Sequence, residues 1–131
     1  MYKVVKNIKL SKNFSISEFV CKEGKKEVLC DYKLIEKLQK LRDKINKPIT
    51  INSGYRSKTY NKKVGGSPKS QHLLGKAADI VTKGIDKEKI KEIAIELGFT
   101  GIGLYDIFVH LDVRNNPHPR GYSFWDNRTK R

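Results

Sequence analysis

The segment from Ile107 to Val113, IFVHLDV, limits the possible folds of this chain more than any other stretch. Its apolar residues recur at every second position, so they share one face of an extended strand: Ile107, Val109, Leu111 and Val113. The opposite face carries Phe108, His110 and Asp112. The pattern therefore predicts a last strand with one face in a core and one face open to chemistry, although a His and an Asp on a strand also occur as an ordinary exposed polar face.

Two helices are predicted from apolar residues at helical spacing. The first begins after Asp31, a favourable N-cap, ends before Pro48 and buries Leu34, Leu38, Leu41 and Ile45. The second ends at Gly98 and is marked by Ile90, Ile93, Ala94 and Leu97. Ser15 and Glu18 resemble a capping box, which predicts a short helix near Ile16.

Two further strands are predicted, at Ile49–Asn52 and Ala77–Val81, with a long polar loop from Arg56 to Gln71 between them. Helices and strands are mixed without a repeating βαβ rhythm. The sequence thus predicts an α+β fold, in which a small, largely antiparallel sheet packs with a few helices. With 131 residues and 37% hydrophobic content, we expect one monomeric domain over residues 1–131 that ends in a short basic tail, DNRTKR.

The charge balance points to polyanionic partners. Lys and Arg number 28 and Asp and Glu 14, which gives a net charge of +14. An anionic bacterial wall polymer or nucleic acid would be attracted, but no helix-turn-helix, zinc-finger or aromatic RNA-binding pattern supports specific nucleic-acid binding. Solubility alone is the alternative explanation.

Neither end of the chain nor its interior resembles a membrane segment. No stretch reaches the roughly 20 apolar residues that span a bilayer. The opening MYKVVKNIKLSKNF lacks the apolar core of a secretory signal peptide, so we expect synthesis in the cytoplasm. Cys21 and Cys30 could form a short disulfide, but we expect two free thiols; four-thiolate zinc sites are excluded.

A metal centre is predicted from residues in two separate segments. In SQHLLGKAAD, His72 ends a polar loop and Asp79 lies within the apolar run AADIV, where a carboxylate needs a neutralising partner. This spacing is a weak signal by itself. Together with His110, however, the two residues would supply the three protein ligands typical of a catalytic zinc, with the fourth position open to water. Arg56, in SGYRS, could bind a carboxylate or a developing oxyanion, although most arginines in so basic a chain are simply solvated.

Three segments in order, SGYRS, NKKVGGSPKSQHLLGKAADI and GIGLY followed by FVHLDVR, resemble the zinc D-Ala-D-Ala carboxypeptidase and peptidoglycan endopeptidase family, within the superfamily that includes hedgehog signalling domains. The resemblance covers about residues 14–114, and FSISEFVC resembles phage and prophage members. It implies that His72, Asp79 and His110 hold Zn²⁺. It also implies that Arg56 faces the substrate, with Ser70 and Gln71 beside it.

The implied activity is hydrolysis of peptidoglycan stem peptides, by a D,D- or L,D-carboxypeptidase or endopeptidase. A phage-type member would reach the cell wall through a holin-type pore. The alternative is a catalytically inactive zinc-containing module that binds the cell wall. Which peptidoglycan bond would be cut does not follow from the sequence.

The general base is the point where this chain departs from the family pattern. Several branches place Glu or Asp three residues before the last zinc-binding His, and others place His two residues before it; these positions are Ile107 and Phe108 here. Asp112 is then the first choice, because it shares a strand face with His110 at about 7 Å along the strand. Asp106 is the second choice. Asp112 could instead orient a ligand or Arg114.

Overall fold

The computed structural model describes residues 2–3, 7–24 and 26–129, and these form one five-stranded sheet with helices and a small two-stranded sheet. The order of the large sheet is β3-β4-β6-β5-β7. Its strands are β3 (Thr50–Ser53), β4 (Ala77–Val81), β5 (Gly101–Leu104), β6 (Val109–Asp112) and β7 (Ser123–Asp126). Every neighbouring pair is antiparallel except β5 and β7, which run parallel. The α+β prediction with a largely antiparallel sheet is confirmed.

Helices α1 (Tyr32–Ile45) and α3 (Lys87–Leu97) are the two predicted helices. The side chain of Asp31 accepts a hydrogen bond from the amide of Lys33 and so caps α1. The helix stops at Asn46, whose left-handed backbone (φ 51°) ends it two residues before Pro48. Gly98 ends α3 in the same conformation, as predicted.

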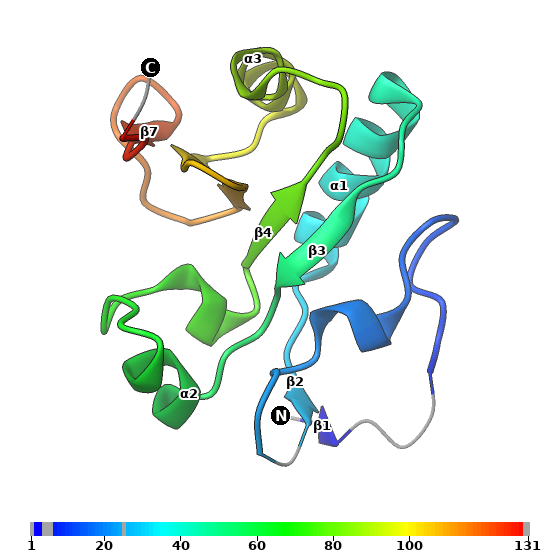
Figure 1. Cartoon of the computed structure of the whole chain (residues 1–131), viewed down its shortest axis with the longest axis vertical. Helices are drawn as coiled ribbons and strands as arrows, with labels where there is room; N and C mark the ends of the chain where they lie inside the picture. Colours follow the sequence, from blue (N-terminus) through cyan, green and yellow to red (C-terminus); the bar gives the residue numbers. More distant parts are fainter. Residues whose placement is uncertain (1, 4–6, 25, 130–131) are drawn as a thin grey trace.

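The hydrophobic core lies between these helices and one face of the sheet. Figure 1 shows α1 behind β3 and β4, and α3 packs against α1, β5 and β6. Fully buried core residues include Leu34, Leu38, Leu41, Ile80, Ile90, Ile102, Leu104 and Leu111. Within the described residues, no helix is long and apolar enough to cross a membrane. Because the helices cover one face of the sheet, the opposite face is left for polar side chains.

The predicted polar loop at residues 56–71 is partly wrong, because it contains the helix α2 (Lys58–Lys63) and the first residue of η2 (Gln71–Leu74). The serine side chains of Ser57 and Ser70 cap these elements. Only Asn61 is buried in α2, so the helix has no apolar stripe that a pattern could reveal. Figure 1 shows α2 at the end of the sheet where β3 ends and β4 begins.

The predicted strand Ile107–Val113 is shorter than expected and is not the last. Ile107 is 73% exposed, because the chain turns between β5 and β6, where the amide of Tyr105 donates to the carbonyl of Phe108. The strands that come before and after it in the chain, β5 and β7, were both missed. The glycines of β5 and the short, half-buried β7 obscure the period-two pattern on which strand prediction depends.

The N-terminal part closes the fold beside β3. The short 3-10 helix η1 (Ile16–Phe19) begins where it was predicted, and Glu18 accepts from the amide of Ser15. Strands β1 (Tyr2–Lys3) and β2 (Glu27–Val28) form the small sheet. Cys21 and Cys30 are free thiols, as expected, and burial raises the pKa of Cys30 to about 12.

The C-terminal segment packs on the domain where a tail was predicted. Asp126 ends β7, and Arg128 pairs with both Asp126 and Glu88 of α3. Thr129 donates two hydrogen bonds to Asp106. Lys130 and Arg131, the end of the predicted tail, lie outside the described residues.

Candidate metal centre

The register of β4 and β6 places Asp79 directly across from His110. Between Val109 and Asp112 the period-two prediction is correct: Val109 and Leu111 join the core, whereas His110 projects from the other face. Asp79 projects on the same side from β4, between buried apolar residues. Two strands that are adjacent in the sheet but distant in sequence thus meet at one carboxylate and one imidazole.

His72 reaches the same point from η2. The hydroxyl oxygen of Ser70 accepts from the amide of His72, and Gly75 ends the turn with a left-handed backbone (φ 69°). Nε2 of His72 lies 3.1 Å and Nδ1 of His110 lies 3.0 Å from the same oxygen, Oδ1 of Asp79. The three potential ligand atoms all lie within 4.8 Å of one another. The structure therefore brings together the three residues predicted to bind a metal.

The outer ring nitrogen of each histidine has a partner that only accepts hydrogen bonds. Nδ1 of His72 lies 2.6 Å from the carbonyl oxygen of Gly54, and Nε2 of His110 lies 2.7 Å from Oδ2 of Asp112. Because these partners only accept, each outer nitrogen can carry the proton, and the inner nitrogen of the neutral ring then has its lone pair free for a metal ion. Without an ion, a protonated ring donates from its inner nitrogen to Asp79. Two imidazole nitrogens and one carboxylate oxygen, fixed in this way, fit a divalent zinc-type ion.

Electrostatics at the centre favour the charged carboxylate. Burial opposes ionisation of Asp79, but hydrogen bonds with His110 and His72 outweigh it and hold the pKa of this carboxyl well below its ordinary value. Burial likewise opposes the charged form of His110, yet hydrogen bonds with Asp112 and Asp79 raise its pKa. The centre thus combines one permanent negative charge with two imidazoles, which is a donor set that attracts a cation.

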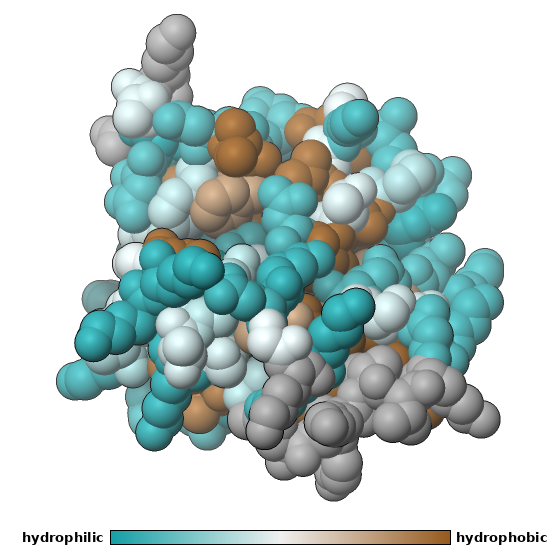
Figure 2. All heavy atoms as spheres, turned by 60° about the horizontal axis from the view of Figure 1, so that its bottom comes forward, coloured by the Kyte–Doolittle hydropathy of each residue, from teal (hydrophilic) through white to brown (hydrophobic). Residues whose placement is uncertain are grey.

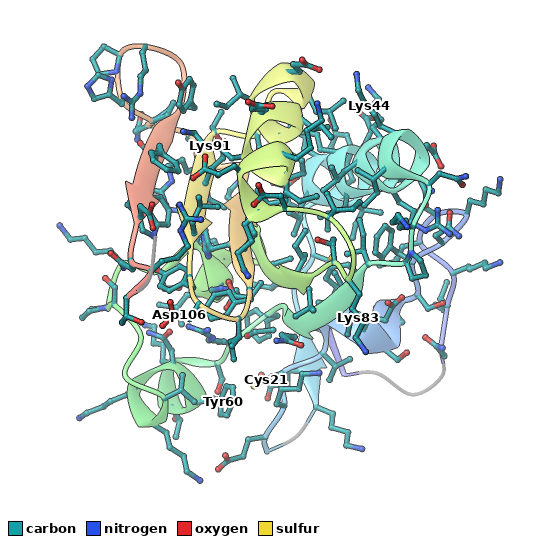
Figure 3. All side chains as sticks on the ribbon, turned by 45° about the horizontal axis from the view of Figure 1, so that its top comes forward. Cys21, Lys44, Tyr60, Lys83, Lys91 and Asp106 are labelled. Atoms are coloured by element: carbon teal, nitrogen blue, oxygen red, sulfur yellow. The ribbon has the colours of Figure 1, made fainter. Side chains whose placement is uncertain are left out.

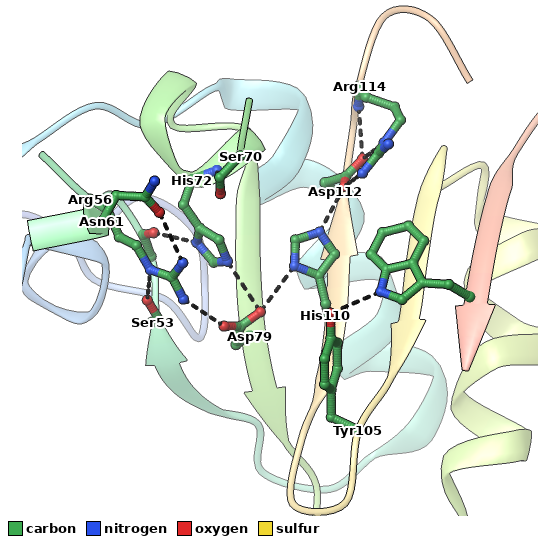
Figure 4. Close-up of polar contacts among 12 residues, drawn as sticks. Ser53, Arg56, Asn61, Ser70, His72, Asp79, Tyr105, His110, Asp112 and Arg114 are labelled. Atoms are coloured by element: carbon green, nitrogen blue, oxygen red, sulfur yellow. Dashed lines mark hydrogen bonds and ion pairs between the residues drawn. The ribbon is translucent and has the colours of Figure 1, made fainter. Parts of the chain in front are cut away.

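Asp112 lies on the far side of the His110 ring from Asp79, as Figure 4 shows. Its side chain is completely buried, and it accepts a two-pronged contact from Arg114, with Nε at 3.0 Å and Nη2 at 2.7 Å. Burial opposes its ionisation, but His110 and Arg114 outweigh this and lower its pKa to about 2. Asp112, the first choice of general base, therefore lies behind His110, one of the three potential metal ligands.

Arg56 lies against the metal centre, on the Asp79 side (Figure 4). Its guanidinium donates to Oδ2 of Asp79, Oγ of Ser53 and Oδ1 of Asn61, each at 3.2 Å. These bonds use three of its five N–H groups and turn Oδ1 of Asp79 toward the histidines. Arg56 is thus a structural partner of the predicted ligand Asp79, with N–H groups left for another acceptor.

The centre opens into a pocket of about 460 Å³. One side is formed by residues 64–67 and 69–71, including Ser70 and Gln71, and the other by Tyr105, Phe108 and Trp125. Oε1 of Gln71 is the buried side-chain oxygen that has no hydrogen-bond partner within the described part of the chain. The two residues predicted to contact substrate therefore line the pocket, and one offers an unused acceptor.

Asp106, the second choice of general base, lies away from this pocket. Figure 3 shows it at the hairpin between β5 and β6. Its carboxylate accepts from the amide and the hydroxyl of Thr129, at 2.9 and 2.8 Å, and it lines a separate hollow with Lys87 and Arg128. The structure does not bring it together with the three potential ligands.

Tyr105 and Trp125 line the pocket but were not predicted as site residues. The glycines of β5 are the sequence signal that could have indicated side chains packed against this strand. A Cβ on Gly101 would lie 2.1 Å from Oδ1 of Asp112, and one on Gly103 would lie 2.3 Å from Nε1 of Trp125. Both glycines lie opposite site residues in the register, since Gly101 pairs with Asp112 and Gly103 with His110. Alternate glycines in GIGLY therefore make room for side chains of the site.

A buried His-Asp-His triad that opens into a polar pocket is a donor set of the kind that metal-dependent hydrolases use. The family model of Peptidase M15 matches residues 12–112, and this chain belongs to that family. Among curated proteins, the zinc D-Ala-D-Ala carboxypeptidase of Streptomyces albus G is 42% identical over 67 residues. The peptidoglycan L,D-endopeptidase MepK of Escherichia coli (strain K12) is 36% identical over 73 residues.

These two matches cover only part of each protein. Each aligned segment takes up 50% of this chain, but 26% of the carboxypeptidase and 40% of the endopeptidase. The similarity to each relative is therefore limited to one segment, which is less than half of that relative's length.

Proposed function

We propose that this protein is a zinc-dependent peptidase that cleaves the stem peptides of bacterial peptidoglycan. The observation that carries the proposal is the His72, Asp79 and His110 triad, whose outer nitrogens are already bound to acceptors. Membership of Peptidase M15 and the two relatives named for zinc and peptidoglycan activities support the substrate class.

In this proposal the zinc ion supplies a Lewis acid that polarises a peptide carbonyl and activates water. The protein supplies orientation. Arg56 holds Asp79 and directs its remaining N–H groups at a substrate carboxylate or carbonyl. The buried Oε1 of Gln71 accepts an N–H of the peptide, which would satisfy an oxygen that has no partner among the described residues. Ser70 keeps the main chain at His72 in place.

We further propose that Asp112 orients His110 and does not accept the proton from water. Both of its oxygens are engaged, by His110 and by Arg114, and neither faces the pocket. A carboxylate in this position fixes the ring and raises the basicity of the nitrogen that faces the metal. The proposed role is that of a positioning residue.

A second candidate function is a zinc-containing module that binds the wall without cleaving it. One observation favours it: Asp79 is the only carboxylate among the described residues that line the pocket, so a separate acid for proton transfer is absent there. Both proposals need the metal centre, but only the peptidase needs turnover.

Digestion of purified peptidoglycan, followed by mass analysis of the released fragments, distinguishes the two proposals. A peptidase releases fragments whose masses identify the cleaved bond as D,D or L,D, and the matched His110→Ala variant releases none. If the wild-type protein with bound zinc sediments with the walls and releases nothing, the peptidase proposal is wrong and the binding module is supported.

Anionic wall polymers are the second proposed partner. Lys58 and Lys62 of α2, with Lys69 at the rim of the pocket, are exposed, and Figure 2 shows hydrophilic residues over much of the side that carries α2. Exposed charges are screened beyond about 10 Å at 0.1 M salt. Binding to intact walls should therefore weaken as salt rises, whereas cleavage of a small soluble stem peptide should change little. Equal salt sensitivity in both assays would contradict a role of this charge in wall binding.

A further inference from the structure

One side of the pocket is an aromatic group made of Tyr105, Phe108 and Trp125. Tyr105 follows β5 and Phe108 precedes β6, and the hydrogen bond that closes the hairpin joins their backbones. Their rings stack with centroids 4.5 Å apart and planes 13° from parallel. The position of the Tyr105 ring is therefore set by the hairpin and by a ring contact on one face.

Trp125 of β7 fixes the other end of Tyr105. Its Nε1–H donates to the Tyr105 hydroxyl oxygen over 2.9 Å. The indole lies over Gly103, where any side chain would collide with it, and its centroid is 5.2 Å from that of His110. The guanidinium of Arg114 lies 5.1 Å from the indole ring. The tryptophan is thus held between a glycine, a potential metal ligand and an arginine.

The direction of this hydrogen bond determines what the tyrosine can still do. A phenol has one proton to donate, and here its oxygen accepts from an indole N–H, which can only donate. The phenol proton must then point away from Nε1. No acceptor for it is recorded among the described residues, and Tyr105, Trp125 and His110 all line the same pocket. The Tyr105 hydroxyl can therefore donate a hydrogen bond to a ligand in this pocket.

Tyr105 and Arg56 flank the centre from different sides. Figure 4 shows the Tyr105 hydroxyl bonded to Trp125, whose ring centroid lies 5.2 Å from that of His110, whereas Arg56 approaches Asp79 from the opposite side. A peptide carbonyl bound between them would meet a donor on each side. Fixed donors aimed at an oxygen that gains charge during the reaction stabilise the transition state, because they need no reorganisation.

We propose that the Tyr105 hydroxyl donates a hydrogen bond to the carbonyl oxygen of the peptide bond that is cleaved, and that Trp125 is the positioning residue that aims it. The phenol keeps its proton, so no bond to Tyr105 forms or breaks. This inference rests on the proposed peptidase function. It adds a substrate-binding donor on the His110 side of the centre.

The test compares Tyr105→Phe, which removes only the hydroxyl, with Tyr32→Phe, which removes the same group from a side chain that is 73% exposed at the start of α1. Tyr105→Phe should lower kcat by about 100-fold, the scale of one lost oxyanion donor, with KM nearly unchanged. It should also weaken binding of a phosphinate analogue of the stem peptide by a similar factor. Zinc content and Tm should stay at the wild-type values, and Tyr32→Phe should leave all five readouts unchanged.

A double-mutant cycle tests the role of Trp125. Trp125→Phe alone should lower kcat, but it should add little in the Tyr105→Phe background, because the indole N–H acts through the hydroxyl. Unchanged kcat and phosphinate binding in Tyr105→Phe would overturn the inference, as would a loss explained by lost zinc or a lowered Tm. If the zinc-loaded wild type neither cleaves peptidoglycan nor binds the phosphinate, the proposed function fails and the inference fails with it. If the wild type is active and Tyr105→Phe equals it, only the inference fails.

Discussion

The two histidines of the centre lie at nearly the same distance from Asp79, but different kinds of group hold them. A main-chain carbonyl, that of Gly54, binds the outer nitrogen of His72. A side-chain carboxylate, that of Asp112, binds the outer nitrogen of His110, and Arg114 in turn holds this carboxylate. One half of the centre is therefore fixed by the fold, and the other by a chain of charged side chains.

This difference predicts how the two halves respond to change. The Gly54 carbonyl does not titrate and no side-chain substitution removes it, and a Cβ at Gly54 would lie 2.6 Å from the Phe19 backbone. The Asp112 carboxylate can be neutralised by one substitution or by acid. The His110 half should thus be adjustable without unfolding, whereas the His72 half should change only when the local backbone changes.

The largest expected effect is the same for both halves of the centre, because each histidine should be indispensable as a metal ligand. His72→Ala and His110→Ala should each abolish stoichiometric zinc binding, since two remaining ligands do not make a stable site. Metal analysis of the purified variants measures this, with His118→Ala, an exposed histidine, as the control. Full zinc content in both site variants would contradict the assignment of the centre.

The second-largest effect tests the half of the centre in which the Asp112 carboxylate holds His110. Asp112→Asn keeps the shape but removes the charge behind His110, so zinc affinity should fall by about 10- to 100-fold and activity should return in excess zinc. Asp43→Asn, on the exposed side of α1, is the control and should change neither. A kcat that falls by about 10² to 10⁴ with zinc still bound would instead make Asp112 the general base.

Acid should weaken the same half in the metal-free protein. The pKa of Asp112 falls from 3.8 to about 2 on folding, so this carboxylate stabilises the fold above about pH 4. That stabilisation, about 2 kcal/mol, is lost as pH falls from 4 toward 2. Urea unfolding of metal-free wild type and Asp112→Asn should therefore differ most above pH 4 and converge toward pH 2. A constant difference across this range would show that the charge of Asp112 does not stabilise the fold.

The smallest expected effect concerns Asp106, whose carboxylate lies outside the metal centre. Asp106→Asn alters only contacts such as those with Thr129, so activity should stay within about 2-fold of wild type, as for ordinary surface substitutions. Zinc content should not change. A defect larger than that of Asp112→Asn would mean that Asp106 takes part in the reaction.

Local pattern was enough to predict the elements whose burial is periodic. The buried face of α1 follows from Leu34, Leu38 and Leu41, and its start from the cap at Asp31. The alternation in β6 placed His110 and Asp112 on one face, as observed. These predictions succeed because side-chain periodicity is a property of a single helix or strand.

Strand prediction failed where the local sequence pattern does not match the burial of the side chains in the fold. Ile107 continues the alternation of β6 but lies at the hairpin turn and is exposed. Strand β5 was missed because Gly101 and Gly103 leave space for Asp112 and Trp125, which belong to neighbouring strands. The residue types at such positions are chosen by partners that are distant in sequence, so no local window contains the reason for them.

The sequence by itself indicated the three residues that could bind a metal here, because it offers two histidines and one carboxylate within an apolar run: His72, Asp79 and His110. The tertiary structure decided how each is held, because sheet register sets Asp79 against His110 and the main chain at Gly54 against His72. It also set Asp112 behind His110 and placed Tyr105 at the pocket, with its hydroxyl bonded to Trp125. Such roles depend on distances of about 3 Å between groups far apart in sequence, and only the packed sheet and its loops establish these distances.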